Sequence, residues 1–241
     1  MKISYFKTIL IFSLYLTFFF NFHLHSYFER IYHSQYSNEF QEYYFLFAGY
    51  FLIFTSFASL FFLSGQRYLF HTLSRAQELD LPVELALLPF VESEFDPYAK
   101  SVDGATGIWQ FMPATGKEWG LKSNWWYDGK KDVLASTEAA LKFLSYLHQK
   151  FDEDWLLAMA AYNTGPSRVN RAIRKNKMQD KGIRFWDLDL PKETTAYVPK
   201  LLVLCELINN PKSFEVNLPS IANRPYFQRR SEEHTSELQS L

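Results

Sequence analysis

Apolar residues recur at helical spacing from about Ser64 to Pro225, and this pattern constrains the fold more than any other feature. Asp132 and Asp154 stand where helix N-caps are expected, and Gly165-Pro166 should end the second of the two helices they begin. No segment alternates apolar and polar residues as a half-buried strand does, and there is no internal repeat. The pattern predicts an all-α domain.

The helices follow from this spacing and from the turn residues between them. Proline is favoured in the first turn of a helix, so Leu81-Pro82 should open the helix that carries Glu92. The expected helices cover residues 68–79, 81–92, 133–147, 155–162, 167–175, and a last one from Lys192 or Thr194 to Ile208.

Composition divides the chain into three parts. Residues 1–60 are apolar and rich in Phe, and they form a signal-like or membrane-anchor-like segment. Within this segment, Ile9–Phe22 has the length of a signal-peptide core. Tyr43–Gln66, which extends slightly past residue 60, is long enough to span a bilayer. Residues 61–228 hold the helical domain. Residues 229–241 resemble the translation of a sequencing adapter, so we expect a disordered tail without function.

Two interpretations of residues 1–60 stay open. Lysines before the second apolar stretch favour a cytoplasmic N-terminus and a single crossing, which would place the helical domain outside the cytoplasm. The alternative is that this part is a translation of T-rich non-coding DNA, because its Phe, Tyr, Ile, Ser and Leu bias is what such DNA encodes.

Charge and cysteine content exclude several classes of protein. The chain has 25 Lys and Arg against 26 Asp and Glu, a balance that does not indicate a nucleic-acid binder. Its single cysteine, Cys205, lies among apolar residues at helical spacing and is expected in the core. No His, Cys or Asp cluster has metal-ligand spacing, so neither a metal nor another cofactor is expected.

Glu92 is the candidate for catalysis. It follows an apolar stretch, Leu85–Val91, and precedes Ser93. A carboxylic acid in such surroundings has its charged form disfavoured by desolvation, so its pKa should rise toward neutrality. A carboxyl group that keeps its proton near pH 7 can act as a general acid.

Three further segments combine hydrogen-bonding side chains with Gly or Pro turns, the mixture found where loops support a site. Taken singly, each has an ordinary structural explanation: Trp109 and Tyr162 as core aromatics, Asn163 as a cap, and Glu193 as a first-turn acid. The segments are Gly107–Pro113, Ala161–Gly165 and Glu193–Tyr197.

Together with Glu92-Ser93, and in this order, these segments resemble the four motifs of the family 1 lytic transglycosylases. Glu84–Pro97 and Leu218–Phe227 further resemble the membrane-bound, type D branch. The resemblance covers about Phe62 to Gln228. It implies a lysozyme-like helical domain of the goose-type or SLT kind. That domain would cleave the β-1,4 bond between N-acetylmuramic acid and N-acetylglucosamine in peptidoglycan and leave 1,6-anhydro ends.

The resemblance also assigns roles to residues. Glu92 would be the catalytic acid and then the base, and Ser101, Gln110 and Tyr197 would hydrogen-bond near it or near the substrate. Tyr162 would line the cleavage subsite and Asn163 would contact the glycan or its peptide. The remaining expected supporting residues are Ser93, Glu193, and the two cleft-wall residues Trp109 and Met112.

The expected partners are peptidoglycan glycan strands, and the bacterial membrane through the N-terminal segment. The protein would act as a monomer in the cell envelope, membrane-associated and facing the periplasm. The resemblance further predicts that the complete gene continues into wall-binding LysM modules. Two alternatives remain: a goose-type lysozyme or chitinase, which needs a second acid, and a glycan-binding protein without activity. Glu84, Glu94, Asp96 and Asp103 are the acids that could fill the second role.

Overall fold

The computed structural model describes residues 65–214, 218 and 220–227. Across these residues the chain is helical, and its only extended pairings are three isolated β-bridges. The all-α prediction is therefore confirmed. The first described helix covers residues 65–78, close to the expected 68–79.

The helix expected over 81–92 is two shorter elements. A 3₁₀ helix, η1 (Val83–Leu87), leads into the α-helix α3 (Leu88–Ser93), which has Pro89 in its first turn. Proline lacks an N–H and restricts the residue before it, so the junction falls at this point. Glu94 and Phe95 then adopt positive φ values of 56° and 62° and turn the chain sharply away.

The middle of the domain follows the expected boundaries closely. After the short helix α4 (Pro113–Glu118), α5 runs over Val133–Lys150 and α6 over Trp155–Thr164. The carboxylate of Asp132 accepts from the Ala135 N–H at the start of α5, and Asp154 does the same for two N–H groups of α6. Both predicted N-caps are thus confirmed.

Gly165 separates α6 from α7 (Pro166–Met178) with a φ of 89°, a region that glycine enters without strain. The 3₁₀ helix η2 (Phe185–Asp187) then leads to α8 (Lys192–Asn209), the last long helix, and η3 (Pro211–Phe214) follows it. Of the two expected starts of this helix, Lys192 and Thr194, the structure has Lys192.

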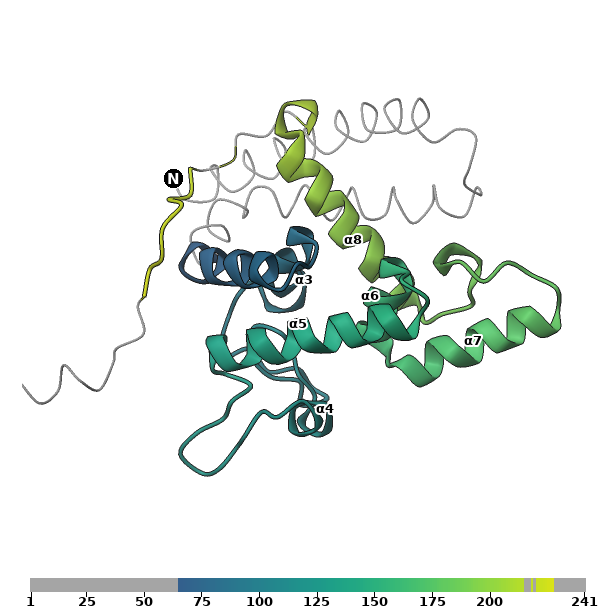
Figure 1. Cartoon of the computed structure of the whole chain (residues 1–241), viewed down its shortest axis with the longest axis horizontal. Helices are drawn as coiled ribbons and strands as arrows, with labels where there is room; N and C mark the ends of the chain where they lie inside the picture. Colours follow the sequence, from purple (N-terminus) through teal and green to yellow (C-terminus); the bar gives the residue numbers. More distant parts are fainter. Residues whose placement is uncertain (1–64, 215–217, 219, 228–241) are drawn as a thin grey trace, which may run out of the picture.

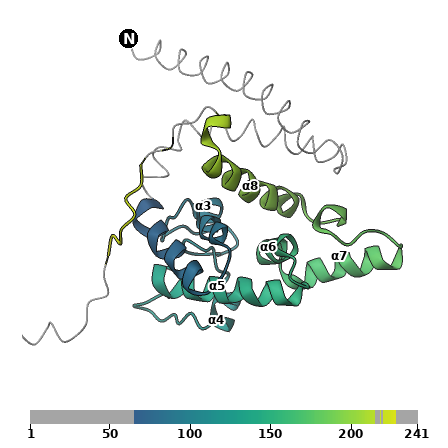
Figure 2. The same ribbon diagram turned by 45° about the horizontal axis from the view of Figure 1, so that its top comes forward.

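α6 is the centre of the domain, with α5, α7 and α8 packed around it (Figures 1 and 2). Its alanines Ala158, Ala160 and Ala161 are fully buried. Small side chains let neighbouring helices approach closely, and a helix that is apolar all round belongs in a core. This arrangement brings the C-terminal end of α6 beside the N-terminal half of α8.

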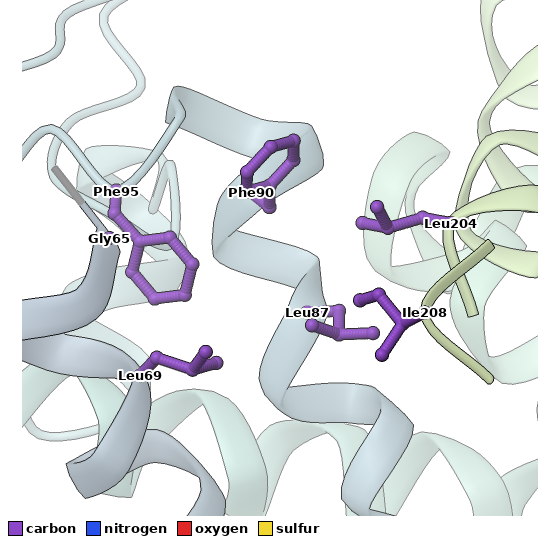
Figure 3. A pocket seen from close by; sticks show the side chains of 7 residues that line it. All are labelled: Gly65, Leu69, Leu87, Phe90, Phe95, Leu204 and Ile208. Carbon is purple, nitrogen blue, oxygen red and sulfur yellow. The ribbon is translucent and has the colours of Figure 1, made fainter. Parts of the chain in front are cut away.

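A small apolar pocket lies where the first described helix, η1–α3 and α8 meet (Figure 3). Phe95 and Leu69 line one side, and Leu204 and Ile208 of α8 line the other. No polar side chain lines this pocket, so it is a packing junction between helices rather than a place for acid–base chemistry.

Among the described helices, none is both long and apolar enough to cross a membrane. The stretches singled out for that role, Ile9–Phe22 and nearly all of Tyr43–Gln66, lie outside the described residues, as does the tail 229–241.

Candidate active site

Glu92 occupies the last turn of α3 and is partly buried. The hydroxyl of Tyr197, on α8, donates a hydrogen bond of 2.5 Å to its Oε1 atom. The two residues are 105 positions apart in the sequence. The packing of α3 against α8 therefore creates the pair, and Glu92 as a residue keeps part of its surface exposed to solvent.

Burial raises the pKa of Glu92 from its ordinary value of 4.5 to about 7. The hydrogen bond from Tyr197 acts in the opposite direction because it stabilises the carboxylate. The negative charge of Glu193 raises the pKa slightly, and the positive charge of Lys200 lowers it. Near neutral pH the carboxyl group is thus divided between its protonated and charged forms, the condition that favours both giving and taking a proton.

Two buried tyrosine hydroxyls lie in the same electrostatic environment. Burial, and then the charge of Glu92, raise the pKa of both Tyr162 and Tyr197 well above the usual value. Both phenols are therefore neutral hydrogen-bond donors at physiological pH. Tyr197 uses its proton on Glu92, and Tyr162 donates to the backbone carbonyl of Trp109 at 2.8 Å.

Ser93 joins α3 to the motif Gly107–Pro113. Its hydroxyl donates to the carbonyl of Ile108 at 3.0 Å and lies 3.3 Å from the carbonyl of Pro89. A hydrogen bond across 15 positions positions the motif loop directly beside the catalytic candidate. In this structure Ser93 therefore holds the backbone of the loop at Ile108 against α3, next to Glu92.

The turn at Gly107 requires a glycine. Its φ is +84°, and a Cβ atom there would lie 1.8 Å from the carbonyl oxygen of Lys130. Gln110 follows with a φ of 45°, and its side-chain amide donates to the Gly107 carbonyl at 2.8 Å. The loop is thus closed on itself by Gln110. Ser101 supports its other side by accepting a hydrogen bond of 3.0 Å from the Ala105 N–H.

Trp109 corrects one expectation, because its ring does not wall a cleft. The side chain is completely buried, and its indole N–H donates 2.9 Å to the hydroxyl of Thr137 on α5. A buried indole needs a partner for its N–H, and α5 supplies one inside the core. Met112 is 42% exposed at the N-cap of α4, which is compatible with a cleft wall.

Asn163 and Glu193 form a second polar cluster where α6 ends and α8 begins. The hydroxyl of Thr194 donates to the Asn163 side-chain oxygen at 2.8 Å, and the Asn163 amide nitrogen lies 3.5 Å from Glu193 Oε1. Thr194 is buried, whereas Glu193 is exposed. No pattern in the sequence indicates these contacts of Thr194 and Thr137, since a threonine within a helix carries no signal of its partner.

The four acids that could serve as a second catalytic carboxylate differ from Glu92 in their exposure to solvent. Glu84, Glu94, Asp96 and Asp103 are all exposed, and Asp96 accepts a hydrogen bond from the Tyr98 N–H within its own turn. Burial raises the pKa of Glu94, and Asp96 adds to the effect. In the part of the chain that the structure describes, no cluster of three or more His, Cys, Asp or Glu could hold a metal.

Four parts of the chain therefore converge at one place: the end of α3 with Glu92, the loop Gly107–Pro113, and the segments Tyr162–Asn163 and Glu193–Tyr197. The family model of the transglycosylase SLT domain matches residues 72–185, which include Glu92-Ser93, Gly107–Pro113 and Ala161–Gly165 but not Glu193–Tyr197. The chain belongs to this family, and the resemblance stated from its motifs is confirmed.

Two individual proteins with similar sequences are a murein transglycosylase and a putative resistance protein. The chain is 47% identical over 158 residues to membrane-bound lytic murein transglycosylase D of Escherichia coli K12, a match that covers 66% of this chain and 35% of that protein. It is 39% identical over 161 residues to a putative tributyltin chloride resistance protein of an Alteromonas species, covering 67% of this chain and 76% of the relative. The chain thus spans about a third of the murein transglycosylase.

Among solved structures, an inactive mutant of lytic transglycosylase Slt from Pseudomonas aeruginosa is 25% identical, with a TM-score of 0.46. The match covers 59% of this chain and 24% of that one.

Proposed function

We propose that the protein is a lytic transglycosylase that cleaves the β-1,4 bond between N-acetylmuramic acid and N-acetylglucosamine in peptidoglycan. The observation that carries this proposal is Glu92, a partly buried carboxyl group with a pKa of about 7 that Tyr197 holds in place. The identity to a murein transglycosylase of E. coli, at 47% over the domain, supports the choice of substrate.

In the proposed reaction, protonated Glu92 first donates its proton to the glycosidic oxygen, and the bond to the anomeric carbon breaks. The resulting carboxylate then takes the proton from the C6 hydroxyl of the muramic acid. That hydroxyl oxygen attacks its own anomeric carbon and closes the 1,6-anhydro ring. One carboxyl group suffices for both steps because the nucleophile belongs to the substrate.

A pKa near 7 suits this double role. A group that must give a proton and then take one works best when neither form is strongly favoured at the operating pH. Tyr197 would steady the carboxylate after the first step, because a hydrogen bond to a charged acceptor is stronger than one to a neutral acceptor.

The remaining supporting residues are proposed in two groups. Ser93, Ser101 and Gln110 would hold the loop beside Glu92 in place. The hydrogen bonds between their side chains and backbone groups of this region support this role. Tyr162, Asn163 and Met112 would contact the substrate, with Glu193 supporting Asn163. The ring of Trp109 is buried in the core, so it belongs to neither group. Its backbone carbonyl accepts the hydrogen bond from Tyr162.

The site of action would be the cell envelope, on its periplasmic side, with the membrane reached through the N-terminal segment. The name of the E. coli relative, which is membrane-bound, supports this placement. The protein would act as a monomer on glycan strands, without a cofactor.

Mass spectrometry of purified murein digested by the parent protein and by Glu92→Gln tests the proposal. We expect products one water lighter than hydrolytic muropeptides with the parent. The variant should turn over roughly two to four orders of magnitude more slowly, since it lacks a general acid, yet still bind glycan. Reducing-end products would instead indicate a hydrolase. Binding by both proteins without products from either would indicate a glycan-binding protein.

A further inference from the structure

The outer face of α7 is strongly basic. Five of the thirteen residues from Pro166 to Met178 are Lys or Arg, and none is acidic. All five are exposed, whereas the apolar residues Val169 and Ala172 are buried on the opposite side. We call the five the α7 basic face: Arg168, Arg171, Arg174, Lys175 and Lys177.

Most of this charge is not neutralised within the domain. Lys175 pairs with Asp189 at 2.9 Å, and Arg168 donates to the hydroxyl of Thr164. Over residues 65–214, 218 and 220–227, no hydrogen bond or ion pair engages the side chains of Arg171, Arg174 or Lys177. In both views α7 lies at the edge of the molecule, with its outer side uncovered by any other labelled helix (Figures 1 and 2).

The face begins next to the site. Asn163 and Thr164 end α6, Gly165 makes the turn, and α7 starts at Pro166. The hydrogen bond of 2.9 Å between Arg168 and Thr164 crosses this turn. A polymer that contacts Glu92 and Asn163 would therefore pass close to Arg168, the first cation of the α7 basic face.

We infer that the α7 basic face binds the carboxylates of the stem peptides that murein carries on its muramic acid residues. The inference rests on the proposed function, because it concerns the same substrate. Each disaccharide repeat of murein can carry a peptide with free carboxylates, so the polymer presents a row of anions. Guanidinium and ammonium groups in a row along a helix complement such a ligand in charge and in repetition.

The distribution of apolar residues favours a soluble polyanion over a lipid surface. A helix that lies on a membrane inserts apolar side chains on the side that meets the lipid. On α7 the apolar side chains Val169, Ala172 and Ile173 instead face the domain and pack in it. Met178, at the end of the helix, is the exposed apolar exception at 82%.

Binding of the full chain to purified sacculi tests the inference. Glu92→Gln serves as the background in every sample so that cleavage is equally slowed in all of them. Arg171→Gln, Arg174→Gln and Lys177→Gln are combined in the test variant. The matched control removes the same charge from exposed lysines elsewhere: Lys117→Gln, Lys122→Gln and Lys212→Gln. Circular dichroism confirms that both variants keep their helices.

We expect the test variant to bind intact sacculi about tenfold more weakly at low salt, since it lacks three exposed cations whose ion pairs are each weak and act together. The difference should shrink as salt rises. On sacculi whose peptide carboxylates have been converted to amides with a carbodiimide and ammonia, the test protein should show no such weakening relative to the background protein.

Three results would overturn the inference: equal weakening by the control variant, equal weakening on the amidated sacculi, or loss of binding to anionic vesicles with sacculus binding unchanged. If the background protein binds neither form of murein, the proposed substrate itself is wrong. If it binds both forms equally and the test variant does too, the proposed substrate stands and only the role of α7 fails.

Discussion

The protonation of Glu92 depends on two opposing effects at the scale of single residues. Burial disfavours the carboxylate, and the hydroxyl of Tyr197 stabilises it. The pKa of about 7 is their balance. Substituting Tyr197 removes the hydrogen bond, and substituting Glu92 removes the titrating group itself, so each substitution gives a prediction.

Tyr197→Phe should raise the pKa of Glu92 further, because burial remains and the hydrogen bond that lowers it is lost. The proposed general acid would act while protonated, so the decline of kcat/KM at alkaline pH should move to higher pH. The pH dependence of murein cleavage measures this. Tyr162→Phe is the control, since its hydroxyl donates to Trp109 and not to Glu92. An unmoved or acid-shifted limb in Tyr197→Phe would contradict the account.

Glu92 should also make folding stability depend on pH. Its pKa is higher in the folded state than in the unfolded state, so its contribution is fully present below about pH 4.5 and lost as pH rises through about 7. Glu92→Gln avoids this loss. Relative to the parent, the variant should gain about 1–3 kcal/mol in free energy of unfolding between pH 4.5 and 8. Urea unfolding at the two pH values measures the gain, and a difference independent of pH would argue against a buried acid.

At the scale of elements, the loop of residues 94–112 decides the geometry beside Glu92, and Gly107 is its tightest point. Gly107→Ala should cost more than about 2 kcal/mol in free energy of unfolding, since the new Cβ would collide with the carbonyl oxygen of Lys130. Denaturant unfolding measures the cost.

Gly104→Ala is the matched control for this substitution. Gly104 has a φ of +91°, similar to Gly107, but nothing lies within 4 Å of an added Cβ. It should lose only about 1 kcal/mol, the cost of an alanine at positive φ. Equal losses in the two variants would show that backbone strain alone, and not the contact with Lys130, makes the glycine necessary.

Element boundaries were predictable where a side chain satisfies the backbone locally. Asp132 and Asp154 cap their helices with hydrogen bonds to N–H groups two or three residues ahead, so the sequence contains the whole interaction. The helix predicted over 81–92 is instead η1 followed by α3, and it ends in a left-handed turn at Glu94, a conformation that a non-glycine residue rarely adopts and that the local sequence does not indicate.

At the scale of the whole molecule, a fragment of residues 61–228 should fold and act alone. The hydrophobic core extends from Ala76 to Leu204, and every residue placed at the site lies within the same limits. We expect cooperative thermal unfolding and the same 1,6-anhydro products as the full chain. The fragment with Glu92→Gln should also unfold cooperatively and should release these products roughly two to four orders of magnitude more slowly. A fragment that fails to unfold cooperatively would show that the domain needs the chain beyond it.

The helical class, the helix caps and the identity of Glu92 as an acid among apolar residues were determined by the sequence, because each rests on neighbours within a few positions. Only the tertiary structure decided that Tyr197, 105 residues away, donates to Glu92, and that Thr194 holds Asn163. It also decided that Trp109 points into the core toward Thr137 and away from the cleft. The direction of a side chain depends on which helix packs beside it, and local spacing does not contain that information.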